Sequence, residues 1–114
     1  MGLKIPKNLP QPMFVRPTDY VSLPGADYVV KRNEFGQAIK LVGRIVRKLP
    51  TDKDVIQALK DHRIVGYWGN KFFVLERVDD EIVDSILETI WEFDKRRGVP
   101  PPDRSVLEDR IYEF

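Results

Sequence analysis

The chain has 114 residues, a length that suits one compact domain. Hydrophobic residues make up 42% of it, which is enough for a buried core and excludes an intrinsically disordered chain. Its 19 basic and 18 acidic side chains leave a net charge of +1, so any electrostatic binding must come from a local patch. The absence of cysteine excludes disulfides, thiolate zinc sites and cysteine nucleophiles.

The N-terminal segment opens without the apolar run of a secretory signal, and no stretch approaches the length of a membrane span. We therefore expect a cytoplasmic protein of a cell or host cell, or a component of a virion, with no membrane partner.

Proline is concentrated at the two ends: of the nine prolines, only Pro50 lies in the middle half of the chain. Proline fixes φ and has no amide donor, so both ends are predicted to be extended. The N-terminal arm, residues 1–26, is nevertheless more apolar than a flexible linker. We expect it to dock on the chain itself or on a partner, through four residues: Met13, Phe14, Val15 and Tyr20.

Two predicted elements follow the arm. Residues 27–32 predict a short strand, because β-branched residues follow Gly25. Residues 38–49 fit a helix better than a strand, since the helical period separates basic from apolar side chains. The basic face of this helix would consist of Lys40, Arg44, Arg47 and Lys48. A hairpin turning at residues 33–36 is the alternative, because Gly36 and Gly43 weaken the helix.

Residues 51–62 predict a second, short helix. Thr51 and Asp54 follow Pro50 as the start of a capping box, and apolar residues then recur at helical spacing.

Residues 64–78 predict a β-hairpin with a two-residue turn at Gly69-Asn70. Such a turn pairs Tyr67 with Phe72 and leaves both faces of the hairpin apolar. The hairpin must therefore be covered twice, by helices, an arm or a partner.

Residues 79–97 predict the longest helix, with acidic residues at its start, basic residues at its end and Gly98 beyond it. Its apolar side chains cover about half the circumference, more than one core stripe usually needs. The surplus suggests a docking face for a partner, carried by Ile86, Ile90, Trp91 and Phe93. In the C-terminal arm, residues 99–114, Asp103 is expected to cap a short terminal helix.

These elements define the expected fold class: a small single-domain α+β protein with three helices, a central β-hairpin at 64–78, a short strand near 27–32 and extended proline-rich arms. The expected body spans residues 27–98.

The chemistry of the side chains indicates no catalytic site. His62, the only histidine, follows Asp61 as if to form an oriented general base, but the dipole at a helix end explains its position more simply. The acidic residues 79–81 look like a metal cluster, yet they open a helix, where acids are favoured. We expect no enzyme activity, no metal, no cofactor and no small-molecule substrate.

The order of the elements resembles the end of a winged helix-turn-helix domain. The resemblance covers residues 34–78, where two helices meeting near Pro50 precede a hairpin. It implies DNA binding, with residues 51–62 as the recognition helix and the hairpin turn as the wing. The acidic start of that helix argues against this use, so the basic residues of 38–49 are the more plausible phosphate contacts, giving weak and non-specific nucleic-acid binding.

The features favour a non-enzymatic interaction protein, an assembly or structural subunit of the kind found in viruses and large complexes. Both arms, the long helix and the hairpin expose more apolar surface than one small core absorbs. The expected partner is a second copy of the chain or another protein. Nucleic-acid binding is the alternative function, and a monomer whose arms cover the body is the alternative state.

Overall fold

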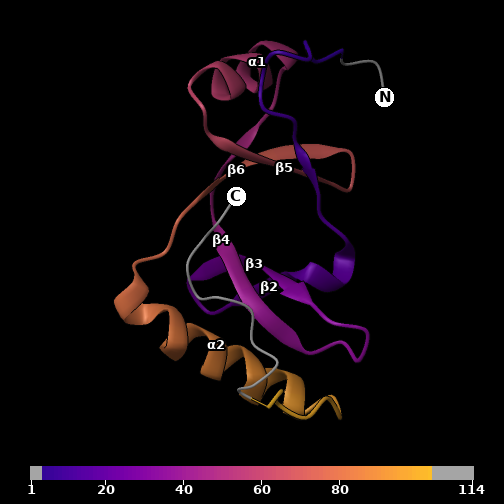
Figure 1. Cartoon of the computed structure of the whole chain (residues 1–114), viewed down its shortest axis with the longest axis vertical. Coiled ribbons are helices and arrows are strands. Elements are labelled where there is room, and N and C mark those ends of the chain that lie inside the picture. The colour runs from indigo at the N-terminus through magenta and orange to yellow at the C-terminus, as the bar shows by residue number, and fades with distance from the viewer. Residues whose placement is uncertain (1–3, 104–114) are drawn as a thin grey trace. The chain divides into compact units, whose positions relative to one another are not determined.

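The computed structural model describes residues 4–103, which form parts of two compact units (Figure 1). Among the described residues, unit 1 consists of residues 4–16 and 45–76, and unit 2 of residues 17–44 and 77–103. The terminal helix expected after Asp103 lies outside the described residues.

The described residues form six strands, one short 3-10 helix and two α-helices. The strands are β1 (Met13–Phe14), β2 (Tyr20–Leu23), β3 (Ala26–Arg32), β4 (Ala38–Leu49), β5 (Ile64–Trp68) and β6 (Lys71–Glu76), and the helices are η1 (Pro17–Asp19), α1 (Asp52–Lys60) and α2 (Asp80–Lys95). The hydrogen-bonded order of the strands is β1-β5-β6-β4-β3-β2. Strand β4 contributes residues 38–44 to unit 2 and residues 45–49 to unit 1.

The expected fold class of three helices around a central hairpin is wrong. Residues 38–49 form the longest strand, β4, so the described part is a mixed six-stranded sheet with two α-helices. Apolar residues occur at both even and odd positions of this segment, and that pattern fits a helical period. A strand that is partly covered on both faces has the same pattern. Leu41 is buried and its neighbour Val42 is half-buried, as such a strand requires. The winged-helix order of elements is lost with this helix.

The alternative for this region, a hairpin turning at residues 33–36, is the one that the structure has. The carboxamide oxygen of Asn33 accepts hydrogen bonds from the amides of Phe35 at 3.0 Å and Gln37 at 2.9 Å. The Gly36 amide donates to the Asn33 carbonyl at 3.0 Å, and Gly36 has a φ of +79°, which glycine adopts without steric cost. Strands β3 and β4 therefore pair antiparallel. The first of them confirms the strand that was expected at residues 27–32.

Unit 2 buries its core between α2 and the strands β2, β3 and β4 (Figure 1). The helix expected at 79–97 is confirmed as α2, whose buried side chains Val83, Leu87 and Ile90 pack in one cluster with strand residues such as Leu41. The indole Nε1 of Trp91 donates to the Ala38 carbonyl at 2.8 Å, which attaches the helix to the start of β4.

A buried ion pair ties the Asn33–Gly36 turn to α2. The Arg32 guanidinium lies 2.8 Å from the Asp94 carboxylate, and their side chains are only 11% and 7% exposed. The same guanidinium donates to the Gly36 carbonyl at 2.8 Å and to the Thr18 carbonyl. Arg32 therefore joins η1, the turn and the long helix within unit 2.

Unit 1 contains the predicted hairpin and the predicted short helix. Strands β5 and β6 pair in the expected register, Tyr67 with Phe72 and Trp68 with Lys71. Helix α1 begins after the N-cap Thr51, whose hydroxyl accepts the Asp54 amide at 3.2 Å. Its buried face forms a second core cluster, with members Leu49, Val55, Ala58, Leu59, Val65 and Val74.

Gly66 in β5 lies opposite Phe73 in β6. A Cβ on Gly66 would lie 2.4 Å from a ring carbon of Phe73, far inside contact distance. The aromatic ring therefore occupies the space that a side chain at position 66 would need.

We predict that Asp94→Asn lowers the free energy of unfolding by about 3–5 kcal/mol, because it leaves the buried Arg32 charge without its carboxylate. Glu92→Gln is the matched control, since it removes one negative charge from an exposed position of the same helix and should change stability by less than about 0.5 kcal/mol. Urea unfolding measures both, and equal effects would show that the ion pair does not stabilise unit 2.

Candidate functional site

The candidate site of unit 1 begins at β1, which pairs parallel with β5 and places Phe14 beside Tyr67. The amide of Val15 continues this pairing by donating to the Tyr67 carbonyl at 3.0 Å. Because side chains alternate along an extended segment, Val15 is buried while Phe14 is 71% exposed.

Phe14, Tyr67 and Phe72 form what we call the aromatic surface. The ring centroids of Phe14 and Tyr67 are 6.5 Å apart, and those of Tyr67 and Phe72 are 4.8 Å apart, with tilted rings in both pairs. These spacings are typical of favourable aromatic contacts. Of the three rings Phe14 is exposed, whereas Tyr67 and Phe72 are half-buried and Phe72 also packs against the core cluster of unit 1.

An apolar hollow of about 380 Å³ lies at the aromatic surface. Its lining combines the extended arm with the hairpin: Ile5, Gln11, Pro12, Met13, Phe14, Tyr67 and Phe72. Gln11 is the one lining residue with a polar side chain other than the Tyr67 hydroxyl, and its amide group donates to the carbonyls of Pro6 and Leu9 at 3.1 Å. The side chains that line the hollow are therefore mostly apolar.

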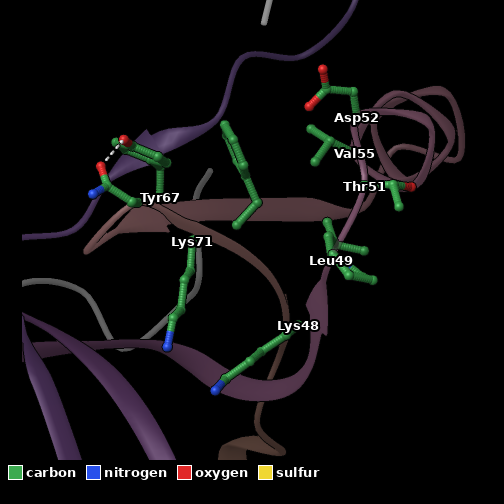
Figure 2. A pocket seen from close by; sticks show the side chains of 10 residues that line it. Lys48, Leu49, Thr51, Asp52, Val55, Tyr67 and Lys71 are labelled. Carbon is green, nitrogen blue, oxygen red and sulfur yellow. Dashed lines mark hydrogen bonds between the residues drawn. The ribbon is translucent and has the colours of Figure 1, made fainter. Parts of the chain in front are cut away.

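A larger hollow of about 640 Å³ adjoins the same two hairpin rings. It is lined by Lys48, Leu49, Pro50, Thr51, Asp52, Val55, Tyr67, Asn70, Lys71 and Phe72. Figure 2 shows the side chains of Lys48 and Lys71 extending to one side of it, with Asp52 on the other. The Tyr67 hydroxyl donates to the Asn70 side chain at 3.1 Å, which holds the ring at the border of the two hollows.

The four basic residues that were expected on one face of a helix lie on a strand instead. They lie along β4, with Lys40 and Arg44 in unit 2 and Arg47 and Lys48 in unit 1. Arg47 and Lys48 are consecutive in a strand, so their side chains leave opposite faces. Lys48 is the member that lines the larger hollow, where its neighbour is Lys71.

The expected docking residues of the N-terminal arm are distributed between the two units. Met13 and Phe14 line the apolar hollow, whereas Val15 is 1% exposed. Tyr20 begins β2 in unit 2, where partial burial, together with the hydrogen bond and charge of Asp27, raises the pKa of its hydroxyl.

The expected docking residues of the long helix are largely used inside unit 2. Ile90 is fully buried, and Ile86 and Trp91 are partly buried against the same core cluster. The ring of Phe93 is half-buried, with the Arg97 guanidinium 4.6 Å from its centre. The apolar side chain of α2 that remains exposed in the described part is Ile82, at 49%.

His62 and the acidic residues 79–81, which were considered for catalysis and for metal binding, line neither of the two hollows. His62 is exposed and follows α1 with a φ of +56°, and the Asp61 carboxylate accepts a hydrogen bond from Gln57 at 3.1 Å. Within residues 4–103, no group of three or more histidine, aspartate and glutamate side chains is placed to hold a metal ion.

Comparison with protein-family models, with curated proteins and with solved structures finds no match for this chain. None of the helices among the described residues is long and apolar enough to cross a membrane.

Sequence reasoning did not select Tyr67, Phe72 or Lys71 as site residues. A signal was present, because the predicted register places Tyr67 and Phe72 together on a face that needs a cover. The sequence did not show that Tyr67 and Phe72 stay partly exposed, or that Phe14 lies next to Tyr67 as a third ring. That depends on the pairing of β1 with β5, which connects residues about fifty positions apart.

We predict that Phe14→Ala and Val15→Ala, which change adjacent residues, differ sharply in their effect on stability. Val15→Ala should lower the free energy of unfolding by about 2 kcal/mol, because it empties a buried position. Phe14→Ala should lower it by less than about 1 kcal/mol, because the ring is already in water. Urea unfolding measures the free energy of unfolding of both variants. A larger decrease for Phe14→Ala than for Val15→Ala would contradict the prediction and show that the Phe14 ring is part of the core.

Proposed function

We propose that the protein is a non-enzymatic interaction protein that docks a protein partner on its aromatic surface. The observation that carries this proposal is Phe14, a large apolar side chain left 71% exposed beside two further rings and an open apolar hollow. Burying a phenylalanine side chain contributes about 1.5–3 kcal/mol. Because Phe14 is exposed, a partner that covers its ring gains this free energy on binding.

The composition of the surface supports a protein partner. Aromatic residues in shallow hollows are over-represented among the few side chains that carry most of the affinity at protein interfaces. The rings are held by strand pairing and by the bond from Tyr67 to Asn70, so little conformational freedom remains to be lost on binding. Lys48 and Lys71 line the larger hollow that adjoins Tyr67 and Phe72, so a partner segment that also reaches this hollow would gain from an acidic side chain.

We predict that a library of displayed random peptides yields ligands that depend on this surface. Selected peptides should combine an apolar side chain with an acidic one and bind with a Kd of roughly 10–100 μM. Phe14→Ser should weaken their binding at least tenfold, because it removes one ring of the surface. Ile82→Ser is the matched control, as it removes an exposed apolar side chain from α2 and should leave binding unchanged. Failure to select peptides that depend on Phe14 would contradict the proposal.

Nucleic-acid binding remains the second candidate, favoured by one observation. Lys48 and Lys71 extend to the same side of a hollow that also contains two aromatic rings (Figure 2). Proteins that bind single strands combine phosphate contacts with base stacking in this way. A thymidine oligonucleotide titrated at low and high salt tests this candidate: binding that falls steeply with salt supports it, and no binding at low salt removes it.

A further inference from the structure

Strand β1 has one open backbone edge, and that edge lies at the aromatic surface. Among residues 4–103, β1 is an end strand of the sheet and pairs with β5 on one side only. The Val15 amide donates to the Tyr67 carbonyl at 3.0 Å, so it faces β5. Backbone groups of successive residues face opposite sides of an extended chain, and the amide and carbonyl of Phe14 therefore face away from β5.

Phe14 is the position at which this edge offers both a donor and an acceptor. Pro12, two residues earlier, has no amide and can offer only its carbonyl to a neighbouring chain. Proline is tolerated next to such an edge, where it limits the pairing to a few residues. A chain that lies along β1 can thus make two hydrogen bonds to Phe14.

Covering the Phe14 ring also removes water from the Phe14 backbone. In the free chain this residue is 71% exposed, and water can satisfy its amide and its carbonyl. A partner that buries the ring leaves both groups unsatisfied unless it supplies an acceptor and a donor, and each unsatisfied group would weaken binding. An extended peptide has both groups available at the spacing of a strand, whereas a helix uses its backbone groups internally.

We propose that the partner docks as an added strand: an extended segment of another protein pairs with the open edge of β1 through the amide and carbonyl of Phe14. The inference rests on the proposed function and specifies the conformation and chemistry of the partner. Directly opposite residues on paired strands have their side chains on the same face, about 4.5–5.5 Å apart. The partner residue opposite Phe14 therefore has its side chain next to the Phe14 ring, at the apolar hollow of about 380 Å³.

The hollow and the edge together define the sequence of such a segment. Pro12, Met13 and the aromatic rings line the hollow, so the partner residue opposite Phe14 should be a β-branched or aromatic one that suits a strand. The same residue cannot be proline, because its amide must donate to the Phe14 carbonyl. Its two neighbours have their side chains on the opposite face, and their amides point away from β1.

Hydrogen exchange of the full chain tests the proposal without any substitution. In the free chain the Phe14 amide should exchange with solvent at least tenfold faster than the Val15 amide, because only the latter is bonded to Tyr67. The probe is the tightest peptide of the displayed library whose binding depends on Phe14. At a peptide concentration of about ten times its Kd, exchange of the Phe14 amide measured by NMR should slow about tenfold, because only the free chain exchanges. The amide of Glu34, an exposed turn residue of unit 2, is the control and should be unaffected.

N-methylation of the same peptide, one residue at a time, tests the strand geometry. A methyl group on the amide opposite Phe14 should weaken binding at least tenfold, because it removes the donor and crowds the edge. A methyl group on the amide of either neighbouring residue should change the Kd by less than about threefold, because that amide points away from β1. Losses that alternate along the peptide are the expected result.

Other results would overturn the proposal. A peptide that depends on Phe14 but leaves the exchange of its amide unchanged would keep the proposed function and confine the contact to side chains. Tolerance of N-methylation at every position would indicate a polyproline helix, and losses at every internal position a bound α-helix. Slower exchange of the Phe14 amide on concentrating the chain alone would assign the edge to a second copy. If no selected peptide depends on Phe14 while the thymidine oligonucleotide binds, the proposed function fails together with the inference.

Discussion

The hydrogen bonds of the Asn33 side chain are the interaction on which this structure depends. Its one carboxamide oxygen accepts two backbone amides and closes the turn that sends the chain back as β4. After this turn β4 pairs antiparallel with β3, and it supplies Leu41 to one core and Leu49 to the other. Arg32 reinforces the turn from the side of the helix through its buried pair with Asp94.

The elements that the sequence predicted are those defined by local signals. The cap at Thr51, the turn at Gly69-Asn70 and the glycine after α2 each require particular residue types at particular positions, and each is found. Residues 38–49 were predicted wrongly because their apolar pattern suits either period. The Asn33 side chain does not distinguish the two structures, because an asparagine oxygen that accepts backbone amides in a tight turn can do the same at the start of a helix.

The aromatic surface was only half predictable. The hairpin register indicates that Tyr67 and Phe72 are neighbours, and the apolar arm indicates that Phe14 seeks a surface. Their meeting depends on a two-residue parallel pairing between distant segments, for which the sequence has no local signal. The long helix shows the opposite error, since its broad apolar arc is used by the sheet of its own unit, with Trp91 bonded to Ala38. An excess of apolar residues in a sequence thus indicates that most of them are buried by other segments, but it does not show which of them stay exposed.

Photo-crosslinking from position 14 tests the central claim, that the aromatic surface docks a protein partner, most directly. Phe14 is replaced by a benzophenone-bearing phenylalanine analogue, and the chain is mixed with a peptide selected for binding to it. The account predicts a crosslink from position 14 to the peptide that excess unmodified chain competes away. Crosslinks confined to the chain itself, while the peptide still binds, would contradict it.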